Sequence, residues 1–410
     1  MLLNFIWIFF FISAFVTATF KLLVLGDTKV FSEIMTALFS LSKTAFEISL
    51  GLSGVLAFWL GIMKIGEHSG FIDVLTRALN PLFSRLMPGI PNDHPALGAM
   101  TMNIAANMLG LDNAATPMGI KAMQEMQTLN PQPEQATDAQ ILFLVINTAS
   151  VTLFPVTIFA YRAQLGAANP TDVFIPILIA TYMSTLTGFL AVAAVQKINL
   201  LNKVVLAYLL GITALIGGIL SYFASLDQAE MLEQSALISH VILFSLVVSF
   251  IAAAAYKRLN AYELFIDGAK QGFQTAITII PYLVAMLVAF GVFRASGALE
   301  LITDGIRLIV NFYGIDNRFI DGLPTALMKP FSGSGARAMM IDTMQSHGAD
   351  SFAGRLASVV QGSTETTFYV LAVYFGAVNI KQIRHAAVCG IIADIGGITA
   401  AILVTYWFFG

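Results

Sequence analysis

Hydroxyl-bearing residues and one carboxylate stand together at the head of an apolar stretch at residues 361–376. The carboxylate is that of Glu365, and it lies between Ser363, Thr364, Thr366 and Thr367. An ionisable side chain at membrane depth is costly, so it usually faces a protein interior or a water-filled cavity. We therefore predict that Glu365 belongs to a polar site for a solute or an ion. The alternative is an interfacial carboxylate paired with a nearby arginine.

Amide side chains and a break in a helix mark a second candidate region, earlier in the chain. Asn103 and Asn107 are four residues apart and therefore share one helix face. Residues 110–117 predict the end of one short helix and the start of another, with Asp112 or Asn113 as the cap. Unwound backbone within lipid needs protein or water partners, so broken helices of this kind indicate a transport site. The alternative is that the amides only join packed helices.

The second half of the chain carries a comparable polar break at residues 332–335, flanked by Lys329 and Arg337. The two cations could balance carboxylates or hold an anionic solute; alternatively, they could extend toward lipid headgroups. Asp394 lies inside the last apolar run, where it is a candidate for proton or cation coupling. An aspartate hydrogen-bonded between two helices is its alternative.

These patterns together predict one solute or ion site built from both halves of the chain. Its predicted residues are Asn103, Asn107, Asp112, Asn113, Thr116, Asn147, Ser150, Lys329, Ser332, Ser334, Arg337, Gln361, Ser363, Thr364, Glu365, Thr366 and Asp394.

Motifs for catalysis, metal binding or nucleotide binding are absent from the sequence. Glu67 and His68 are adjacent, so their side chains diverge on a helix, and no second histidine lies one turn away. The Gly-Ser-Gly run at 333–335 lacks the spacing of a phosphate-binding loop. We expect no enzymatic activity, no cofactor and no bound metal. The net charge of −3 and the scattered lysines and arginines predict no nucleic-acid partner.

The composition predicts which elements must position these residues. Hydrophobic residues make up 57% of the chain and charged residues 11%, and the mean hydropathy is +0.80. This predicts an all-α fold, a polytopic transmembrane helical bundle in contact with the lipid bilayer. The amphipathic segments 71–86 and 296–310 should lie at the membrane interface. Helices are predicted at about 1–24, 46–65, 96–111, 139–161, 172–195, 204–223, 236–256 and 273–293, with a connection at 26–43.

The two halves repeat the same order of elements, including the amphipathic segment and the polar break. Three pairs of segments align without gaps and with similar shifts along the chain, which indicates an internal duplication. The pairs are 69–73 with 296–300, 118–123 with 339–344, and 147–154 with 361–368. We predict a transmembrane helix at 1–25, a first repeat at 44–197, a transmembrane hairpin at 198–258 and a second repeat at 262–410.

Lysines and arginines between the apolar runs predict an orientation in the membrane. Lys21, Lys29 and Lys43 follow the first helix, which places the N-terminus outside and the next loop in the cytoplasm. Lys257 and Arg258 precede the second repeat and indicate the cytoplasm as well. The charge clusters before both halves therefore favour parallel repeats over inverted ones.

Four stretches resemble signature sequences of a bacterial family. AFWLGIMKIGEHSG at 57–70 and NIAANMLGLDNAATPMG at 103–119 are similar to spore maturation protein A. PFSGSGARAMM at 330–340 and QGSTETTFYVLAVYFG at 361–376 are similar to spore maturation protein B. The chain thus resembles a fusion of the two, with two nucleoside-recognition, or Gate, domains. The resemblance implies a transport-like architecture and a role in spore core dehydration, and it carries no substrate with it.

Pattern and resemblance lead to one functional expectation and one rival. We expect a multi-pass transporter or channel-like protein of the bacterial inner membrane that moves a small polar solute or ion. The rival is a non-transporting membrane scaffold or ligand-sensing protein. The resemblance and the small size of each half also favour a homodimer.

Overall fold

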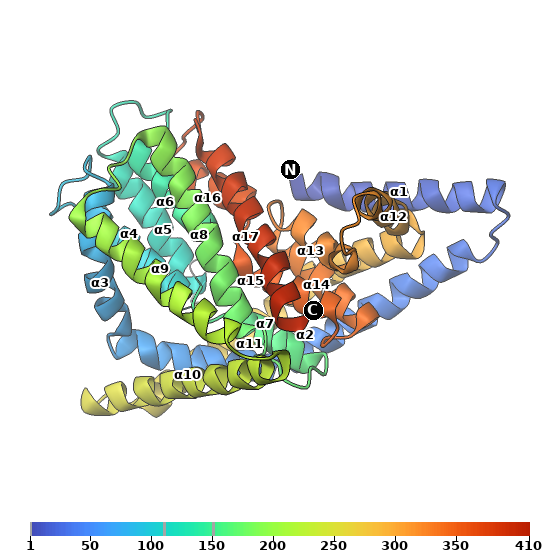
Figure 1. Cartoon of the computed structure of the whole chain (residues 1–410), viewed down its shortest axis with the longest axis horizontal. Coiled ribbons are helices and arrows are strands. Elements are labelled where there is room, and N and C mark those ends of the chain that lie inside the picture. The colour runs from blue at the N-terminus through green and yellow to red at the C-terminus, as the bar shows by residue number, and fades with distance from the viewer. Residues whose placement is uncertain (1, 110–111, 150–151) are drawn as a thin grey trace.

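The computed structural model describes residues 2–109, 112–149 and 152–410, and helices dominate it (Figure 1). α1 (Leu2–Val24) is joined by a short turn to α2 (Val30–His68). The predicted connection at 26–43 is therefore wrong for residues 30–43, which form the first turns of α2. Polar residues are tolerated there because the hydroxyls of Thr36 and Ser42 donate to carbonyls one turn back in the same helix.

α2 packs along the equally long α11 (Ala261–Ala295), and the two helices run antiparallel. Gly268 lies so close to the carbonyl of Leu60 that a Cβ atom would not fit between them. Farther along the pair, Gly291 lies against Leu41. Rising residue numbers on one helix thus meet falling numbers on the other, which fixes the antiparallel direction.

Each long helix turns through a left-handed glycine into an amphipathic helix. Gly70 has φ 87° and leads into α3 (Phe71–Leu86), whereas Gly297 has φ 84° and leads into α12 (Ala298–Phe312). A positive φ favours glycine, so the same turn occurs at matching positions of both halves. Because α2 and α11 are equivalent and antiparallel, the two repeats are inverted. The expectation of parallel repeats is wrong.

A hairpin of half-helices follows each amphipathic helix. α4 (Pro95–Met108) and α5 (Asp112–Gln127) confirm the break predicted in the first half. His94 before α4 lies 3.4 Å from the hydroxyl of Thr128 after α5, so the chain returns to the side from which it entered. A hairpin that returns does not cross the membrane, which is why the charge pattern alone misplaced the repeats. The matching elements of the second half are η1 (Arg318–Gly322), α13 (Leu323–Met328) and α14 (Gly333–His347).

A second break in each repeat was not predicted in the first half. The chain forms α6 (Asp138–Thr148) and α7 (Val156–Gln164), so the uninterrupted helix expected at 139–161 is wrong. Pro155 cannot donate a backbone hydrogen bond within a helix. The backbone N–H of Leu153 instead donates to the carbonyl of Met108 at the end of α4, 2.9 Å away.

The second repeat breaks at the equivalent place, between α15 (Phe352–Ser363) and α16 (Thr367–Gly376). The N–H of Phe368 donates to the carbonyl of Pro330 between α13 and α14, at 3.0 Å. The N–H of Glu365 donates to the carbonyl of Thr148 in the first repeat, at 2.8 Å. Each repeat thus ties its second break to its first, and one bond links the two repeats through their second breaks.

The last helices of the two repeats, α8 (Phe174–Gln196) and α17 (Ala386–Phe409), pack closely through small residues. Gly188 lies against the methyl group of Ala393, and the hydroxyl of Ser184 donates to the carbonyl of Ala393 at 3.0 Å. Small residues let backbones approach in this way within membranes. α9 (Lys203–Ala224) and α10 (Gln228–Tyr256) form the predicted hairpin between the repeats.

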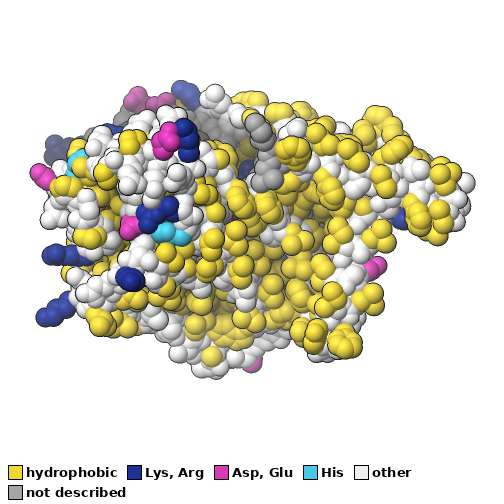
Figure 2. Space-filling view, turned by 90° about the horizontal axis from the view of Figure 1, so that it is seen from above, with side chains coloured by type: hydrophobic (Ala, Val, Ile, Leu, Met, Phe, Trp, Pro, Cys, Tyr) yellow, Lys and Arg dark blue, Asp and Glu magenta, His cyan; other side chains and the backbone are white. Residues whose placement is uncertain are grey.

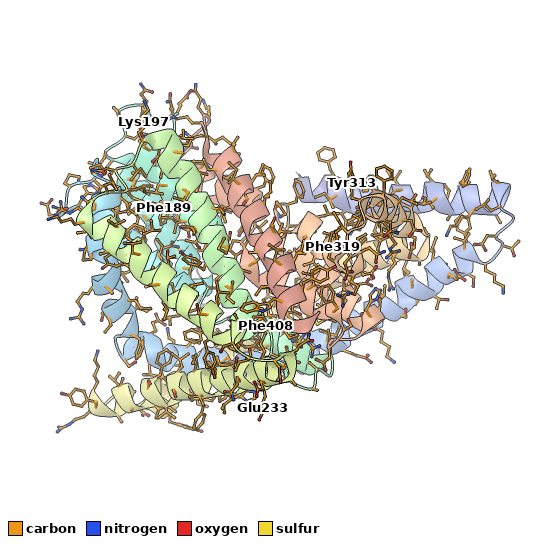
Figure 3. All side chains as sticks on the ribbon, viewed as in Figure 1. Phe189, Lys197, Glu233, Tyr313, Phe319 and Phe408 are labelled. Carbon is orange, nitrogen blue, oxygen red and sulfur yellow. The ribbon has the colours of Figure 1, made fainter. Side chains whose placement is uncertain are left out.

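The surface fits a lipid environment. Among the described residues, α1, α2, α8, α9, α10, α11 and α17 are long and apolar enough to cross a membrane. Charged side chains gather toward one end of the molecule, and much of the remaining visible face is apolar (Figure 2). Lys197, after α8, points outward at that end (Figure 3). The chain is a multi-pass, all-α membrane protein.

Candidate functional site

The helix breaks of both repeats meet at one cavity of about 280 Å³. Residues at the ends of half-helices line this space, among them Asn107 near the end of α4, Lys329 after α13 and Gln361 near the end of α15. The polar residues that line it are Asn107, Thr116, Asn147, Thr152, Thr157, Lys329, Arg337, Gln361, Glu365, Tyr369 and Tyr374. The structure therefore brings together predicted site residues that lie more than 250 positions apart, Asn107 and Glu365 among them.

Two asparagines form the part of the cavity that the first repeat supplies. The side-chain amide of Asn107 donates to the side-chain carbonyl of Asn147 at 2.9 Å. The amide of Asn147 donates in turn to the carbonyl of Phe143 at 2.9 Å, which holds its side chain along α6. This chain of bonds joins the α4–α5 break to the α6–α7 break.

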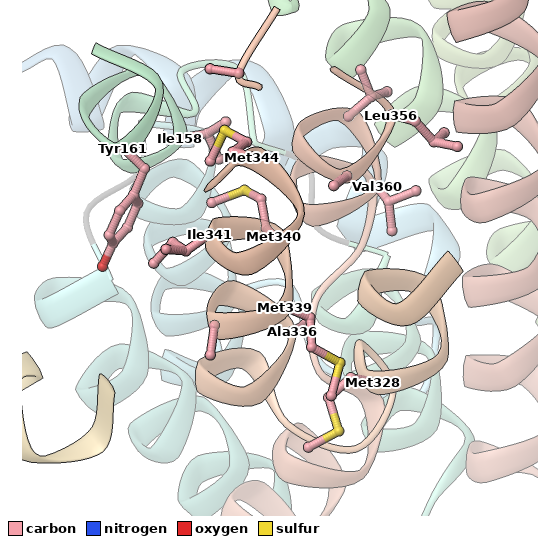
Figure 4. Packing of buried hydrophobic residues seen from close by; sticks show 14 of the residues in the cluster. Ile158, Tyr161, Met328, Ala336, Met339, Met340, Ile341, Met344, Leu356 and Val360 are labelled. Carbon is pink, nitrogen blue, oxygen red and sulfur yellow. The ribbon is translucent and has the colours of Figure 1, made fainter. Parts of the chain in front are cut away.

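Two cations from the second repeat line the same cavity. Lys329 directly follows α13 and is 2% exposed. Arg337 lies one turn into α14, with its guanidinium 5.8 Å from the centre of the Tyr161 ring on α7. Apolar packing fixes α14 between α7 and α15, where Ile341 and Met340 lie near Tyr161 and Ile158 (Figure 4).

Hydrogen-bond acceptors come from the break between α15 and α16. Gln361 is 8% exposed, and its side-chain carbonyl oxygen has no hydrogen-bond partner in the described part of the chain. Glu365 is exposed and lines the cavity, while its backbone N–H is held by Thr148. The break thus presents one amide carbonyl and one carboxylate to the cavity.

Asn103 lies outside the cavity lining and has a structural part. Its buried amide donates to the carbonyl of Ala115 at 2.7 Å and lies 3.3 Å from the hydroxyl of Tyr374. It therefore clamps α4 to α5 and to α16. The helix-packing alternative holds for this asparagine.

Asp394 is buried behind the cavity and does not line it. Thr367 donates its hydroxyl to one carboxylate oxygen of Asp394 at 2.7 Å, whereas the other oxygen has no hydrogen-bond donor among the described residues. Thr364, fully buried at the same break, also leaves its hydroxyl oxygen without a partner in that set. The hydrogen bond between Thr367 and Asp394 joins the α15–α16 break to α17.

Several predicted site residues lie outside the cavity lining or outside the described residues. The hydroxyl of Ser332 caps α14 by accepting from the N–H of Gly335, and Ser334 lies beside it at 3.3 Å. The hydroxyl of Ser363 donates to the carbonyl of Val360 in its own helix. Thr366 is the N-cap residue of α16. Ser150 and the side chains of Asp112 and Asn113 lie outside the described residues.

The aromatic and aliphatic part of the lining was not predicted from the sequence. Tyr369 and Tyr374 come from α16, four and nine residues after Glu365, and Phe154 and Pro155 precede α7. Pro155 was the available signal, because a proline inside an apolar run predicts a break. The apolar run around Pro155 is long enough for one continuous helix, so the proline was not interpreted as a break.

An ion cluster closes one end of the interface between the repeats. The guanidinium of Arg162 after the α6–α7 break is fully buried and lies 2.8 Å from Asp172 and 3.1 Å from Asp350. Arg355 bonds Asp172 as well, at 2.8 Å. Burial raises the pKa of Asp172, and the charges of Arg162 and Arg355 oppose that shift.

The opposite end of the same helices carries exposed ion pairs. Lys381 lies 2.6 Å from Glu134, and Arg384 lies 2.8 Å from Asp138, with all four side chains at least one-third exposed. These pairs join the start of α6 to the loop after α16, as Arg162 and Asp350 join the end of α7 to the start of α15. The two ends thus differ in burial although the repeats place them equivalently.

Within the described residues, no three side chains of histidine, cysteine, aspartate or glutamate gather closely enough to hold a metal ion. Cys389 is buried in α17 and has no cysteine partner.

Comparisons with known proteins agree with the two-repeat architecture. The family model described as Gate, nucleoside recognition, matches residues 49–165 and 276–381. Spore maturation protein A of Bacillus subtilis (strain 168) is 46% identical over 152 residues, which are 37% of this chain and 78% of the relative. Spore maturation protein B of the same organism is 45% identical over 165 residues, 40% of this chain and 91% of the relative. No solved structure matches the chain.

Proposed function

Because the chain belongs to the spore maturation family of membrane proteins with nucleoside recognition (Gate) domains, we propose that it is a transporter-like protein of the bacterial inner membrane. It moves a small polar solute or ion through the cavity between the repeats. The observation that carries this proposal is the convergence of the helix breaks on one polar cavity.

Inverted repeats supply the symmetry that such movement needs. A site between two inverted repeats can open to either side when one repeat rocks against the other. The breaks place polar side chains at the cavity, and polar side chains within the membrane generally mark a pathway. The buried ion cluster at Arg162 and the exposed pairs at Lys381 and Arg384 hold the two ends unequally, as expected of a state closed at one end.

Flux into liposomes tests the proposal. The full chain is reconstituted, and uptake of radiolabelled glycine, uridine and inorganic phosphate is measured together with proton movement by a pH-sensitive dye. We expect at least one flux above that of empty liposomes, and we expect Asn107→Ala and Glu365→Gln to lower it at least tenfold. Glu233→Gln is the matched control, because it makes the same chemical change at an exposed position of α10, outside the two repeats.

If both cavity variants leave every measured flux unchanged, the site assignment is wrong. If the wild-type chain moves none of the probes, the rival function as a scaffold or ligand-sensing protein gains support. Thermal unfolding then separates the two, since a scaffold should lose several degrees when Glu365 is neutralised, whereas a functional site often gains stability or stays level.

A further inference from the structure

The charges around the cavity are divided between two neighbouring breaks. Lys329 and Arg337 come from the α13–α14 break and supply cationic donors. Glu365 and Gln361 come from the α15–α16 break and supply a carboxylate and an amide carbonyl. A donor side and an acceptor side in one cavity favour a ligand with both an anionic and a cationic end.

The two sides are held at a fixed separation by direct contacts. Phe368 donates its N–H to the carbonyl of Pro330, next to Lys329, and the rings of Phe331 and Phe368 stack at 5.3 Å between centroids. Gly333 approaches the hydroxyl of Thr366 so closely that a Cβ atom would lie 2.8 Å from it. The breaks are therefore adjacent, and a small molecule can reach both.

The acceptor side contains an atom that requires a donor. Gln361 lines the cavity, and its buried side-chain carbonyl oxygen has no hydrogen-bond partner in the described part of the chain. A buried acceptor without a donor costs free energy. An ammonium group bound near Glu365 would donate to this oxygen as well as to the carboxylate.

The net charge of the ligand distinguishes a zwitterion from a simple anion or cation as the occupant of the cavity. Among the side chains that line the cavity, Lys329 and Arg337 are cationic and Glu365 is anionic. A zwitterion adds no net charge to this set, whereas an anion or a cation would add a net charge that must be carried through a low-dielectric layer. The volume of about 280 Å³ is just below the usual range for ligand pockets, which favours a small ligand.

From these observations we propose that the cavity binds a small zwitterion with a carboxylate and an ammonium group, as in the α-amino acids, and this inference rests on the proposed function. Lys329 and Arg337 hold the carboxylate. Glu365 and Gln361 hold the ammonium group.

Calorimetric titration of the full chain in nanodiscs tests the assignment without any transport. The ligands are the twenty α-amino acids, with propionate and ethylamine as the halves of alanine and uridine as a neutral solute. We expect at least one amino acid to bind, and we expect its two half-molecules and uridine to bind at least tenfold more weakly. Binding of uridine without any amino acid, equal binding of the carboxylate half alone, or binding of none of the twenty would each overturn the proposal.

Variants assign the two ends of the ligand. Arg337→Met should weaken binding of the amino acid at least tenfold, while Arg337→Lys, which keeps the charge, should weaken it only a few-fold. Glu365→Gln should weaken the amino acid but leave the carboxylate half unchanged or tighter. Arg258→Met is the matched control, because it removes an exposed guanidinium that is not among the residues lining the cavity. Equal loss in Arg337→Lys and Arg337→Met, or unaltered binding in Arg337→Met and Glu365→Gln, contradicts the assignment.

Flux measurements keep this inference distinct from the function on which it rests. Transport of uridine or phosphate without amino-acid binding would overturn the ligand class and leave the transport function standing. Amino-acid binding without flux of the bound amino acid would support the ligand class and overturn the transport function.

Discussion

The guanidinium of Arg162, at the end of α7, lies 3.1 Å from the carboxylate of Asp350, just before α15, and joins the two inverted repeats beside their broken helices. Arg162 is fully buried, and it also contacts Asp172 and the carbonyl of Ala349. At the equivalent place on the other side of the breaks, Arg384 pairs with Asp138 in an exposed position. Equivalent contacts with unequal burial allow the two ends to be compared directly.

Removing the buried arginine should destabilise the protein far more than removing its exposed counterpart. Arg162→Met removes one of the two arginines that lie 2.8 Å from the buried Asp172 and leaves Arg355 in place, so it should cost about 3 kcal/mol, the lower end of the cost of breaking a buried ion pair. Arg384→Met breaks an exposed pair and should cost about 0–1 kcal/mol. Thermal unfolding of the two variants in the same detergent measures the difference. Equal losses would show that Arg162 does not hold the repeats together.

Asn103 and Asn107 share a helix face but should respond differently to truncation. Asn103→Ala removes the amide that donates to Ala115 and should cost about 1–3 kcal/mol of stability, because a buried carbonyl loses its donor. Asn107→Ala removes a residue that lines the cavity and should lower flux at least tenfold with a smaller loss of stability. Paired unfolding and uptake measurements on both variants provide the check. A loss of flux in Asn103→Ala together with a loss of stability in Asn107→Ala would show that Asn103 has the functional part and Asn107 the structural one.

Local sequence chemistry predicted the parts of the fold that depend on neighbours in the chain. The all-α membrane class, the amphipathic helices and the break before Asp112 follow from composition, periodicity and capping, and the structure confirms them. Convergence of Asn107 with Glu365 was predicted only in outline, as one site built from both halves. Their common cavity depends on the direction of the repeats, which no local pattern specifies.

The errors arose where tertiary contacts replace local ones. The break before Val156 exists because the N–H of Leu153 finds the carbonyl of Met108 in another helix. The predicted parallel orientation of the repeats was wrong because it was inferred from lysine positions together with the number of membrane crossings between them. A returning hairpin such as α4–α5 adds no crossing. Asn103 was assigned to the site because it shares a face with Asn107, yet its amide is used to hold α5.

Close packing between α2 and α11 makes their glycines sensitive to a single methyl group. At Gly268, a Cβ atom would overlap the carbonyl oxygen of Leu60, so Gly268→Ala must push the antiparallel helices apart and should cost about 1–3 kcal/mol. At Gly54, in α2, no atom lies within 4 Å of an added Cβ. Gly54→Ala should therefore be neutral or stabilise by up to about 1 kcal/mol. The unfolding temperatures of the two variants test this prediction. An unchanged unfolding temperature in Gly268→Ala would contradict the close contact with Leu60.

His385 should titrate below its ordinary pKa of 6.5. Partial burial at the start of α17 lowers the pKa of His385, and the charge of Arg384 lowers it further, whereas Asp138 raises it. Its ring lies 3.1 Å from the side-chain amide of Gln196. The depressed pKa favours the neutral ring in the folded state, so this stabilisation is present above pH 6.5 and is lost as the pH falls through the folded-state pKa.

Nuclear magnetic resonance of histidine-labelled protein measures this value, with the His385→Gln spectrum to assign the signal. Arg384→Gln should raise the pKa of His385, and Asp138→Asn should lower it further. A wild-type value above 6.5 would contradict the burial of the ring.

Thr367 and Asp394 form the last pair whose roles can be separated by substitution. The hydroxyl of Thr367 donates to the buried carboxylate at 2.7 Å. Thr367→Val keeps the shape of the side chain but removes the donor, and it should cost about 1–3 kcal/mol because a buried acceptor is left without its donor. Thr367→Ser retains the hydroxyl and serves as the control.

Asp394→Asn removes a buried ionisable group, so it should leave stability level or higher while lowering flux if the carboxylate couples transport to an ion. The double variant Thr367→Val with Asp394→Asn completes a cycle in which the two stability effects should not add, since the same hydrogen bond is involved. Additive effects would show that the hydroxyl and the carboxylate act independently, and an unaltered flux in Asp394→Asn would assign Asp394 to helix packing alone.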